Sequence, residues 1–288
     1  MATTAHLPPA WHDWIKQNLE RGCDPQSLIA DMIRSNFEPL FASTVVRDLI
    51  HGKTVAVAAL PASYVYERAR IASGNLIRTP DRDIRVSLRI ERPLVVFLDD
   101  LLSHAECDEL IEHSRDRLTR STTVDPNSGQ GTVIDARSSE GTYFPINANP
   151  FIAKLDRRIA ALMNMPVENG EGLQILHYLT GGQYTPHFDY FPPSDPGSKP
   201  HLANGGQRVA SLVMYLNEVE DGGATVFPEL NLQVGPKKGG AVYFEYCNSR
   251  GQVDPLTLHG GMPVLQGEKW IATKWMRERF YRQADSAD

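Results

Sequence analysis

The chain has 288 residues, a length that fits one large domain or one large domain with a smaller partner. Apolar residues make up 41% and charged residues 22%, the balance of an ordinary globular protein. The net charge of −6 leaves no basic surplus to neutralise phosphates, so we expect no nucleic-acid partner. No stretch of about 18 uninterrupted apolar residues occurs, so we expect no membrane span and no membrane partner.

The N-terminal residues and the cysteines both predict a cytoplasmic protein. The first residues lack the basic region and the apolar run of a secretory signal. Cys23, Cys107 and Cys247 are odd in number, lie far apart and show no CxxC spacing. We therefore expect reduced thiols and neither a disulfide framework nor a zinc site.

The first part of the chain carries helical patterns. Apolar side chains repeat at helical spacing over residues 11–19, and Asp24-Pro25 is typical of a helix N-cap followed by Pro at the first helical position. A third helix is predicted over residues 39–50. We assign residues 1–83 to a small N-terminal helical region.

From residue 84 the apolar period changes from helical to two, which indicates a strand over residues 84–90. Ser103 and Glu106 form a capping box that opens one helix, and Asn149-Pro150 opens another. Strand-like runs separated by turns then follow at 173–179, 184–189, 208–216, 224–227, 232–234, 241–246, 256–259 and 269–280. This order predicts an α+β domain over residues 84–288, a barrel or jelly-roll with helices packed on one side.

One segment carries the residue types of a metal site. His187 and Asp189 are two apart in a strand-like run, so their side chains project from the same face. With a third ligand from a distant strand they would form the two-histidine, one-carboxylate triad that leaves iron positions open. The pair alone is a weak signal, because such spacing is common by chance.

A second segment strengthens this interpretation. His259 ends a strand-like run, a turn is predicted at Pro263–Gly267, and Lys269 opens the next strand. We expect a hairpin that returns Lys269 to the cavity of His259. A buried ammonium needs an anionic partner, which a dicarboxylate co-substrate would supply.

The residue blocks at 173–178, 184–190, 213–217, 221–228 and 269–275 resemble, in the same order, those of the 2-oxoglutarate- and Fe(II)-dependent oxygenases of the prolyl 4-hydroxylase family. The resemblance covers roughly residues 90–282 and implies a double-stranded β-helix (jelly-roll) core. It also implies Fe(II), the co-substrates 2-oxoglutarate and O₂, and L-ascorbate as reductant. The residue roles that it implies are His187, Asp189 and His259 as metal ligands, Lys269 and Tyr178 on the distal carboxylate of 2-oxoglutarate, Tyr184 as a catalytic residue near the metal, and Arg208 and Trp275 in the substrate channel.

Simpler roles remain open for several of these side chains. Tyr178, Tyr184 and Trp275 are alternatively packing aromatics, and Arg208 is alternatively part of a surface ion pair. The Pro- and Gly-rich stretch at 190–206 is expected to be a loop, acting either as a lid over a peptide or as a plain surface connection.

Three functions compete at this point. The first is a procollagen-proline 4-dioxygenase-like enzyme that hydroxylates a proline residue in a peptide or protein substrate. The second hydroxylates a free amino acid or another small molecule. The third is a non-catalytic metal-binding β-helix that serves as an interaction module. The complete triad together with Lys269 argues against the third, because a pure binding module needs no anchor for a co-substrate.

Overall fold

The structure is a computed structural model, and it describes residues 7–282 except residues 8, 36, 38, 53–63 and 135. By its internal contacts the chain divides into two compact units, Met1–Tyr64 and Val65–Asp288. Residues 65–83, which the sequence interpretation places with the N-terminal region, make their contacts in the second unit. There Arg70 forms an ion pair with Glu245, with 2.8 Å between Nη1 and Oε2.

The first unit consists of helices in the ranges that the sequence predicts. They are α1 (Pro9–Glu20), α2 (Pro25–Arg34) and α3 (Pro39–Ile50). Asp24 caps α2, because its carboxylate accepts a hydrogen bond from the Ser27 amide. This unit has a hydrophobic core of its own, formed by Leu7, Ile15, Leu28, Met32, Phe37, Ala42, Val45 and Val46.

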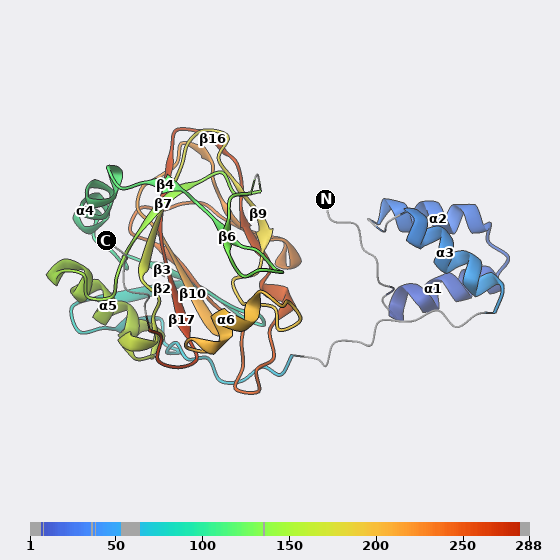
Figure 1. Ribbon diagram of the computed structural model, residues 1–288, viewed down its shortest axis with the longest axis horizontal. Helices are drawn as coiled ribbons and strands as arrows, with labels where there is room; N and C mark the ends of the chain where they lie inside the picture. Colours follow the sequence, from blue (N-terminus) through green and yellow to red (C-terminus); the bar gives the residue numbers. More distant parts are fainter. Residues whose placement is uncertain are drawn as a thin grey trace. The chain divides into compact units, whose positions relative to one another are not determined.

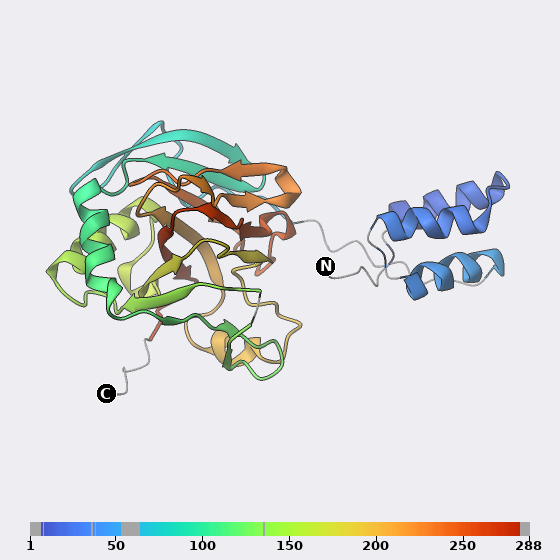
Figure 2. The ribbon, with the colours of Figure 1, turned by 90° about the horizontal axis from the view of Figure 1, so that it is seen from above.

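Two antiparallel sheets form the frame of the second unit (Figures 1 and 2). Within the described residues, the larger sheet has nine strands in the order β1-β2-β3-β14-β10-β17-β8-β7-β4. Its strands are β1 (Leu76–Arg78), β2 (Asp83–Glu91), β3 (Leu94–Asp99), β4 (Thr119–Arg120), β7 (Glu140–Phe144), β8 (Leu173–Tyr178), β10 (Arg208–Tyr215), β14 (Ala241–Glu245) and β17 (Lys269–Arg277). The central strands β10 and β17 are buried almost throughout, as the middle of a covered sheet requires.

The smaller sheet has the order β13-β12-β15-β9 and, with the larger one, makes the expected jelly-roll. Its strands are β9 (Tyr184–His187), β12 (Thr225–Phe227), β13 (Leu232–Val234) and β15 (His259–Gly261). The remaining strands form two short two-stranded sheets. One pairs β5 (Thr123–Val124) with β6 (Gly131–Thr132), and the other pairs β11 (Asp221–Gly222) with β16 (Val264–Gln266).

The helices of this unit begin where the sequence predicts. Ser103 and Glu106 form the capping box of α4 (His104–Arg115), and Asn149 caps α5 (Pro150–Met163). Both helices add apolar side chains to the core of the sheets, and they lie together on the side of the unit away from β9 (Figures 1 and 2). Single 3₁₀ turns occupy Val167–Asn169, Pro228–Leu230 and Pro255–Thr257.

Several predicted elements were wrong in detail. The run at 256–259 begins as a 3₁₀ turn, and the strand β15 starts only at His259. The turn predicted at 263–267 contains β16, and the loop at 190–206 contains a short helix, α6 (Ser198–Ala203). None of the helices in the described part of the chain combines the length and apolar character that a membrane span requires.

Candidate active site

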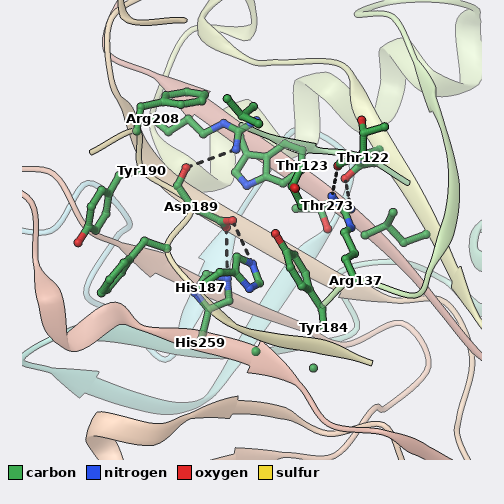
Figure 3. Close-up of a pocket in the computed structure, with 18 of the residues that line it drawn as sticks. Thr122, Thr123, Arg137, Tyr184, His187, Asp189, Tyr190, Arg208, His259 and Thr273 are labelled. Atoms are coloured by element: carbon green, nitrogen blue, oxygen red, sulfur yellow. Dashed lines mark hydrogen bonds and ion pairs between the residues drawn. The ribbon is translucent and has the colours of Figure 1, made fainter. Parts of the chain in front are cut away.

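A cavity of about 660 Å³ opens between the two sheets of the second unit. Strands β8, β10 and β17 of the larger sheet contribute to its lining, as do β9, β12 and β15 of the smaller one. The volume is typical of cavities that bind small molecules or a peptide side chain. Figure 3 shows the polar side chains that converge in it.

The predicted metal ligands meet in this cavity. Strands β9 and β15 pair in a register that places His187 directly opposite His259. The Asp189 carboxylate faces both rings, with Oδ1 3.6 Å from Nε2 of His187 and Oδ2 3.5 Å from Nε2 of His259 (Figure 3). One ligand atom from each residue lies within 4.8 Å of the others.

Both imidazoles are oriented by a carbonyl two residues earlier in the chain. Nδ1 of His187 lies 2.9 Å from the Thr185 oxygen, and Nδ1 of His259 lies 3.0 Å from the Thr257 oxygen. A carbonyl only accepts, so each Nδ1 carries the hydrogen and each Nε2 presents a lone pair toward Asp189. This is the tautomer that a metal ligand needs.

The charge state of the site also suits a divalent metal. Burial lowers the pKa of His187, and the neighbouring His259 lowers it further. Burial alone would raise the pKa of Asp189, but the two histidines hold it well below its usual range. Two imidazole nitrogens and one carboxylate form the donor set of Fe(II) oxygenase sites, so the residues present fit this metal.

Lys269 has no anionic partner in the part of the chain that the structure describes. Its side chain is buried, and burial lowers its pKa to about 8. Lys274 on the same strand β17 is equally buried, but its Nζ lies 2.8 Å from Asp156. Since a buried ammonium is costly without an anion, the cavity at Lys269 fits a carboxylate ligand.

Tyr178 lies directly opposite Lys269 in the pairing of β8 with β17. The ammonium is 5.6 Å from the centre of the tyrosine ring, and both residues line the cavity. Burial raises the pKa of Tyr178, so its phenol keeps its hydrogen for donation. A phenol and an ammonium side by side are suited to bind one carboxylate.

The expected hairpin between His259 and Lys269 was wrong. His259 lies on β15 in the smaller sheet, and Lys269 begins β17 in the larger sheet. The chain between them forms β16, which pairs with β11 instead of β17. The two residues still line one cavity, because the sheets that carry them face each other across it.

Tyr184 stacks on His187, a predicted metal ligand, with 3.6 Å between the ring centres and 19° between the planes. The guanidinium of Arg137, which also lines the cavity, lies 4.9 Å from the centre of the Tyr184 ring. Burial raises the pKa of Tyr184 to about 12, so its phenol stays protonated at neutral pH. Tyr184 therefore presents a hydrogen-bond donor beside the metal ligands.

Arg208 and Trp275 lie next to each other in the cavity. The guanidinium is 4.0 Å from the Trp275 ring centre and forms two 2.7 Å hydrogen bonds to Glu171. It also donates to the carbonyl of Asp189 at 3.3 Å (Figure 3). The Arg208–Glu171 pair is thus largely buried beside the predicted metal ligands.

A β-bulge sets the direction of Arg208. The register of β10 against β17 shifts between Arg208 and Ala210, which adds one residue to the strand at that point. Arg208 therefore lines the same cavity as Val213, although simple alternation would send the two to opposite faces. On β17, where no shift occurs, Lys269 and Trp275 share the cavity as strand parity predicts.

Two segments meet over the cavity. One is the β5–β6 hairpin, and the other is the stretch 190–206, both of which contribute lining residues. The Gly197 amide donates to the Pro126 carbonyl at 2.8 Å, and Nε2 of His201 lies 2.9 Å from the Gly129 oxygen. We name these four residues and the contacts between them the latch.

Sequence reasoning missed several polar residues of the site. Arg137, Glu171 and Ser211 lie in or beside the cavity and stand outside the matching blocks, and Thr225 lies in the block 221–228 but received no role there. Glu171 occupies a short connection just before β8, and Arg137 a stretch with no clear strand pattern. Their partners are remote in the chain, so no local spacing indicates them.

Comparison with known proteins places this geometry among oxygenases. Residues 173–277 match the 2OG-Fe(II) oxygenase superfamily. The chain is 39% identical over 209 residues to probable prolyl 4-hydroxylase 10 of Arabidopsis thaliana, covering 66% of this chain and 71% of that protein. It is 35% identical over 227 residues to prolyl 4-hydroxylase 2 of the same plant, covering 72% and 73%.

A solved structure is similar as well. The viral collagen prolyl hydroxylase of Paramecium bursaria Chlorella virus-1, solved in complex with 2-oxoglutarate, aligns with a TM-score of 0.51 and 30% identity. The alignment covers 64% of this chain and 95% of the viral chain.

Proposed function

This chain belongs to the prolyl 4-hydroxylase family of 2-oxoglutarate- and Fe(II)-dependent oxygenases, and we propose that it hydroxylates a proline residue in a peptide or protein at carbon 4. An enzyme of this family uses Fe(II), 2-oxoglutarate and O₂, and ascorbate is its typical reductant. When bound, the iron and 2-oxoglutarate activate O₂, so that one oxygen atom enters a substrate C–H bond while succinate and CO₂ are released.

In this proposal each group of side chains has one task. His187, Asp189 and His259 would hold Fe(II), and Lys269 with Tyr178 would bind the distal carboxylate of 2-oxoglutarate. Tyr184 would donate a hydrogen bond beside the metal. Arg208 and Trp275 would orient the substrate, supported by Glu171.

The unpaired ammonium of Lys269 is the observation that most favours an enzyme over a binding module. It lines the same cavity as the triad, and its charge needs an anion that the described residues do not supply. A module that only binds metal has no use for such a costly group. The names of the relatives and the latch over the cavity support a peptide substrate.

Succinate release tests this proposal. Purified protein is supplied with Fe(II), 2-oxoglutarate and ascorbate, and then with proline-rich peptides, the same peptides with alanine in place of proline, or free proline. We expect stimulation by the proline peptides alone, a gain of one oxygen atom by the peptide in mass spectrometry, and loss of both signals in His187→Ala.

The other functions predict different results. Stimulation by free proline alone would assign the enzyme to small-molecule substrates. An absence of succinate under all conditions, with iron bound, would favour the interaction module. The cytoplasmic location remains a proposal, and the free thiols of Cys23, Cys107 and Cys247 support it.

A further inference from the structure

The carboxylate of Asp189 has a hydrogen-bond partner that is not a metal ligand. The hydroxyl of Ser211 lies 2.6 Å from Asp189 Oδ2, and the hydroxyl of Tyr246 lies 2.9 Å from Ser211 Oγ. Ser211 is on β10 and Tyr246 directly follows β14, the neighbouring strand of the larger sheet. Asp189 follows β9 of the smaller sheet, so these contacts connect the two sheets at the metal site.

The direction of both hydrogen bonds follows from the chemistry of the three groups. An ionised carboxylate only accepts, so Ser211 donates its single hydrogen to Asp189. The serine oxygen can then only accept from Tyr246, whose phenol supplies the second hydrogen. Both Ser211 and Tyr246 are completely buried, which excludes water as the usual competitor for these bonds.

The two oxygens of Asp189 therefore differ in their surroundings. Oδ2 accepts a short, charge-assisted hydrogen bond, which draws electron density away from a bond to metal. Each oxygen faces one imidazole, Oδ1 at 3.6 Å from Nε2 of His187 and Oδ2 at 3.5 Å from Nε2 of His259, but only Oδ2 accepts the hydrogen bond from Ser211. The arrangement favours coordination through Oδ1 alone.

We propose that Ser211, held by Tyr246, is a positioning residue that keeps Asp189 a one-oxygen ligand of the metal. A carboxylate binding through both oxygens would take a position from the three that the triad leaves open. 2-Oxoglutarate needs two of these positions and O₂ needs the third. The two histidines are oriented by backbone carbonyls, whereas Asp189 is oriented by the side chain of Ser211. Among these contacts, a substitution at Ser211 therefore changes the orientation of a ligand directly. This inference rests on the proposed metal site and not on the proposed substrate.

Cobalt(II) binding tests the inference without any turnover. The full-length protein, Ser211→Ala and Tyr246→Phe are titrated with Co(II), and the visible absorption of the bound ion reports its coordination. The controls are Ser114→Ala and Tyr243→Phe, which remove equally buried hydroxyls that bond to Leu110 and Glu245, away from the metal site. The thermal unfolding of each metal-free variant is measured in parallel.

We expect Ser211→Ala to weaken Co(II) binding about 10- to 100-fold and to change the absorption spectrum. Tyr246→Phe should weaken binding about 2- to 10-fold, because Ser211 can still donate to Asp189 but is no longer held. If Ser211→Ala does not fold, Tyr246→Phe carries the test.

Two results would overturn the inference. One is Co(II) affinity and absorption within two-fold of the wild type in both site variants, and the other is an equal loss in the two controls. Wild-type protein that binds no Co(II) would refute the metal site itself. A failure of proline peptides to stimulate succinate release leaves the Co(II) titration readable, so the two failures are distinguishable.

Discussion

Lys269 and Tyr178 occupy directly opposite positions on the neighbouring strands β17 and β8, and both line the cavity that contains the triad. Antiparallel pairing brings opposite side chains on one face to within about 5 Å of each other. The two donors are thus positioned by the register of the sheet and not by a flexible loop. A carboxylate bound between them would meet a preformed site.

The first prediction concerns the affinity for 2-oxoglutarate. We expect Lys269→Met to weaken binding about 10- to 100-fold, because a charge-assisted bond is lost, and Tyr178→Phe to weaken it about 5-fold. Calorimetric titration of the Mn(II)-loaded variants with 2-oxoglutarate under nitrogen measures both affinities. The affinity of Lys269→Arg for 2-oxoglutarate should lie between those of Lys269→Met and the wild type. An unchanged affinity in Lys269→Met would show that the carboxylate anchor lies elsewhere.

The lowered pKa of Lys269 gives a second prediction, on proton uptake. With a pKa of about 8, the free lysine is mostly neutral at pH 8.5, and a bound carboxylate should restore its charge. Binding at pH 8.5 should therefore take up about 0.8 proton, and binding at pH 7 only about 0.1. The affinity should fall as the pH rises above about 8, since binding then requires protonation.

Titrations in buffers of different ionisation enthalpy measure this uptake. Lys269→Arg is the matched control, because a guanidinium stays charged throughout this range and should take up no proton. An equal uptake in the arginine variant would assign the proton to another group.

The sequence predicted those parts of the site that depend on local spacing. Lys269 and Trp275 share a face of β17 through strand parity, and His187 and Asp189 meet as their spacing predicted, although β9 ends at His187 and Asp189 lies in the bend that follows it. The capping box of α4 and the N-cap of α5 are local as well. The helix starts followed from such patterns, whereas the strand runs left a barrel or a jelly-roll open and the resemblance to the oxygenase family implied the jelly-roll.

The parts that could not be predicted depend on contacts between remote segments. Which strand lies opposite His187 is decided by the whole topology, and the turn chemistry at 263–267 gave the wrong hairpin partner for Lys269. The direction of Arg208 depends on one extra residue in β10 that alternation cannot reveal. Ser211 is an unremarkable strand residue until Asp189 is placed beside it.

A third prediction concerns Glu171, which accepts two hydrogen bonds from Arg208 and lies 2.7 Å from Nε of Arg277. Glu171→Gln would remove the counter-charge of two guanidinium groups, the largely buried one of Arg208 and the fully buried one of Arg277. We expect a loss of about 3 kcal/mol in the free energy of unfolding and an approximately 10-fold higher KM for a proline peptide. The affinity for 2-oxoglutarate should change less than two-fold, since Lys269 and Tyr178 are untouched.

Chemical unfolding and steady-state kinetics measure these effects. Asp99→Asn is the control, because it neutralises the exposed pair of Asp99 with Lys237, and such exposed pairs contribute little to stability. A Glu171→Gln protein with unchanged peptide KM would make the Arg208 pair a purely structural feature.

The last prediction concerns the latch over the cavity. A Cβ added at Gly197 would lie 2.4 Å from the Asp125 carbonyl and 2.6 Å from the Gly129 amide, so Gly197→Ala must push the two covering segments apart. The backbone of Gly197, with φ of −67°, suits alanine, so the steric clash alone causes the change. We expect a peptide KM at least about 5-fold higher, because a peptide would lose one wall of its channel. Succinate release without peptide should stay within two-fold, because the triad and Lys269 lie outside the latch.

Gly235→Ala is the matched control for this change. A Cβ at Gly235 would meet nothing within 4 Å, and its φ is not in the left-handed region, so both its kinetics and its stability should match the wild type. Limited proteolysis of the 190–206 stretch adds a readout that does not depend on activity. We expect faster cleavage there in Gly197→Ala, since separation of the segments frees the backbone for a protease. Unchanged cleavage together with an unchanged peptide KM would show that the two segments keep the cavity covered without the contact at Gly197.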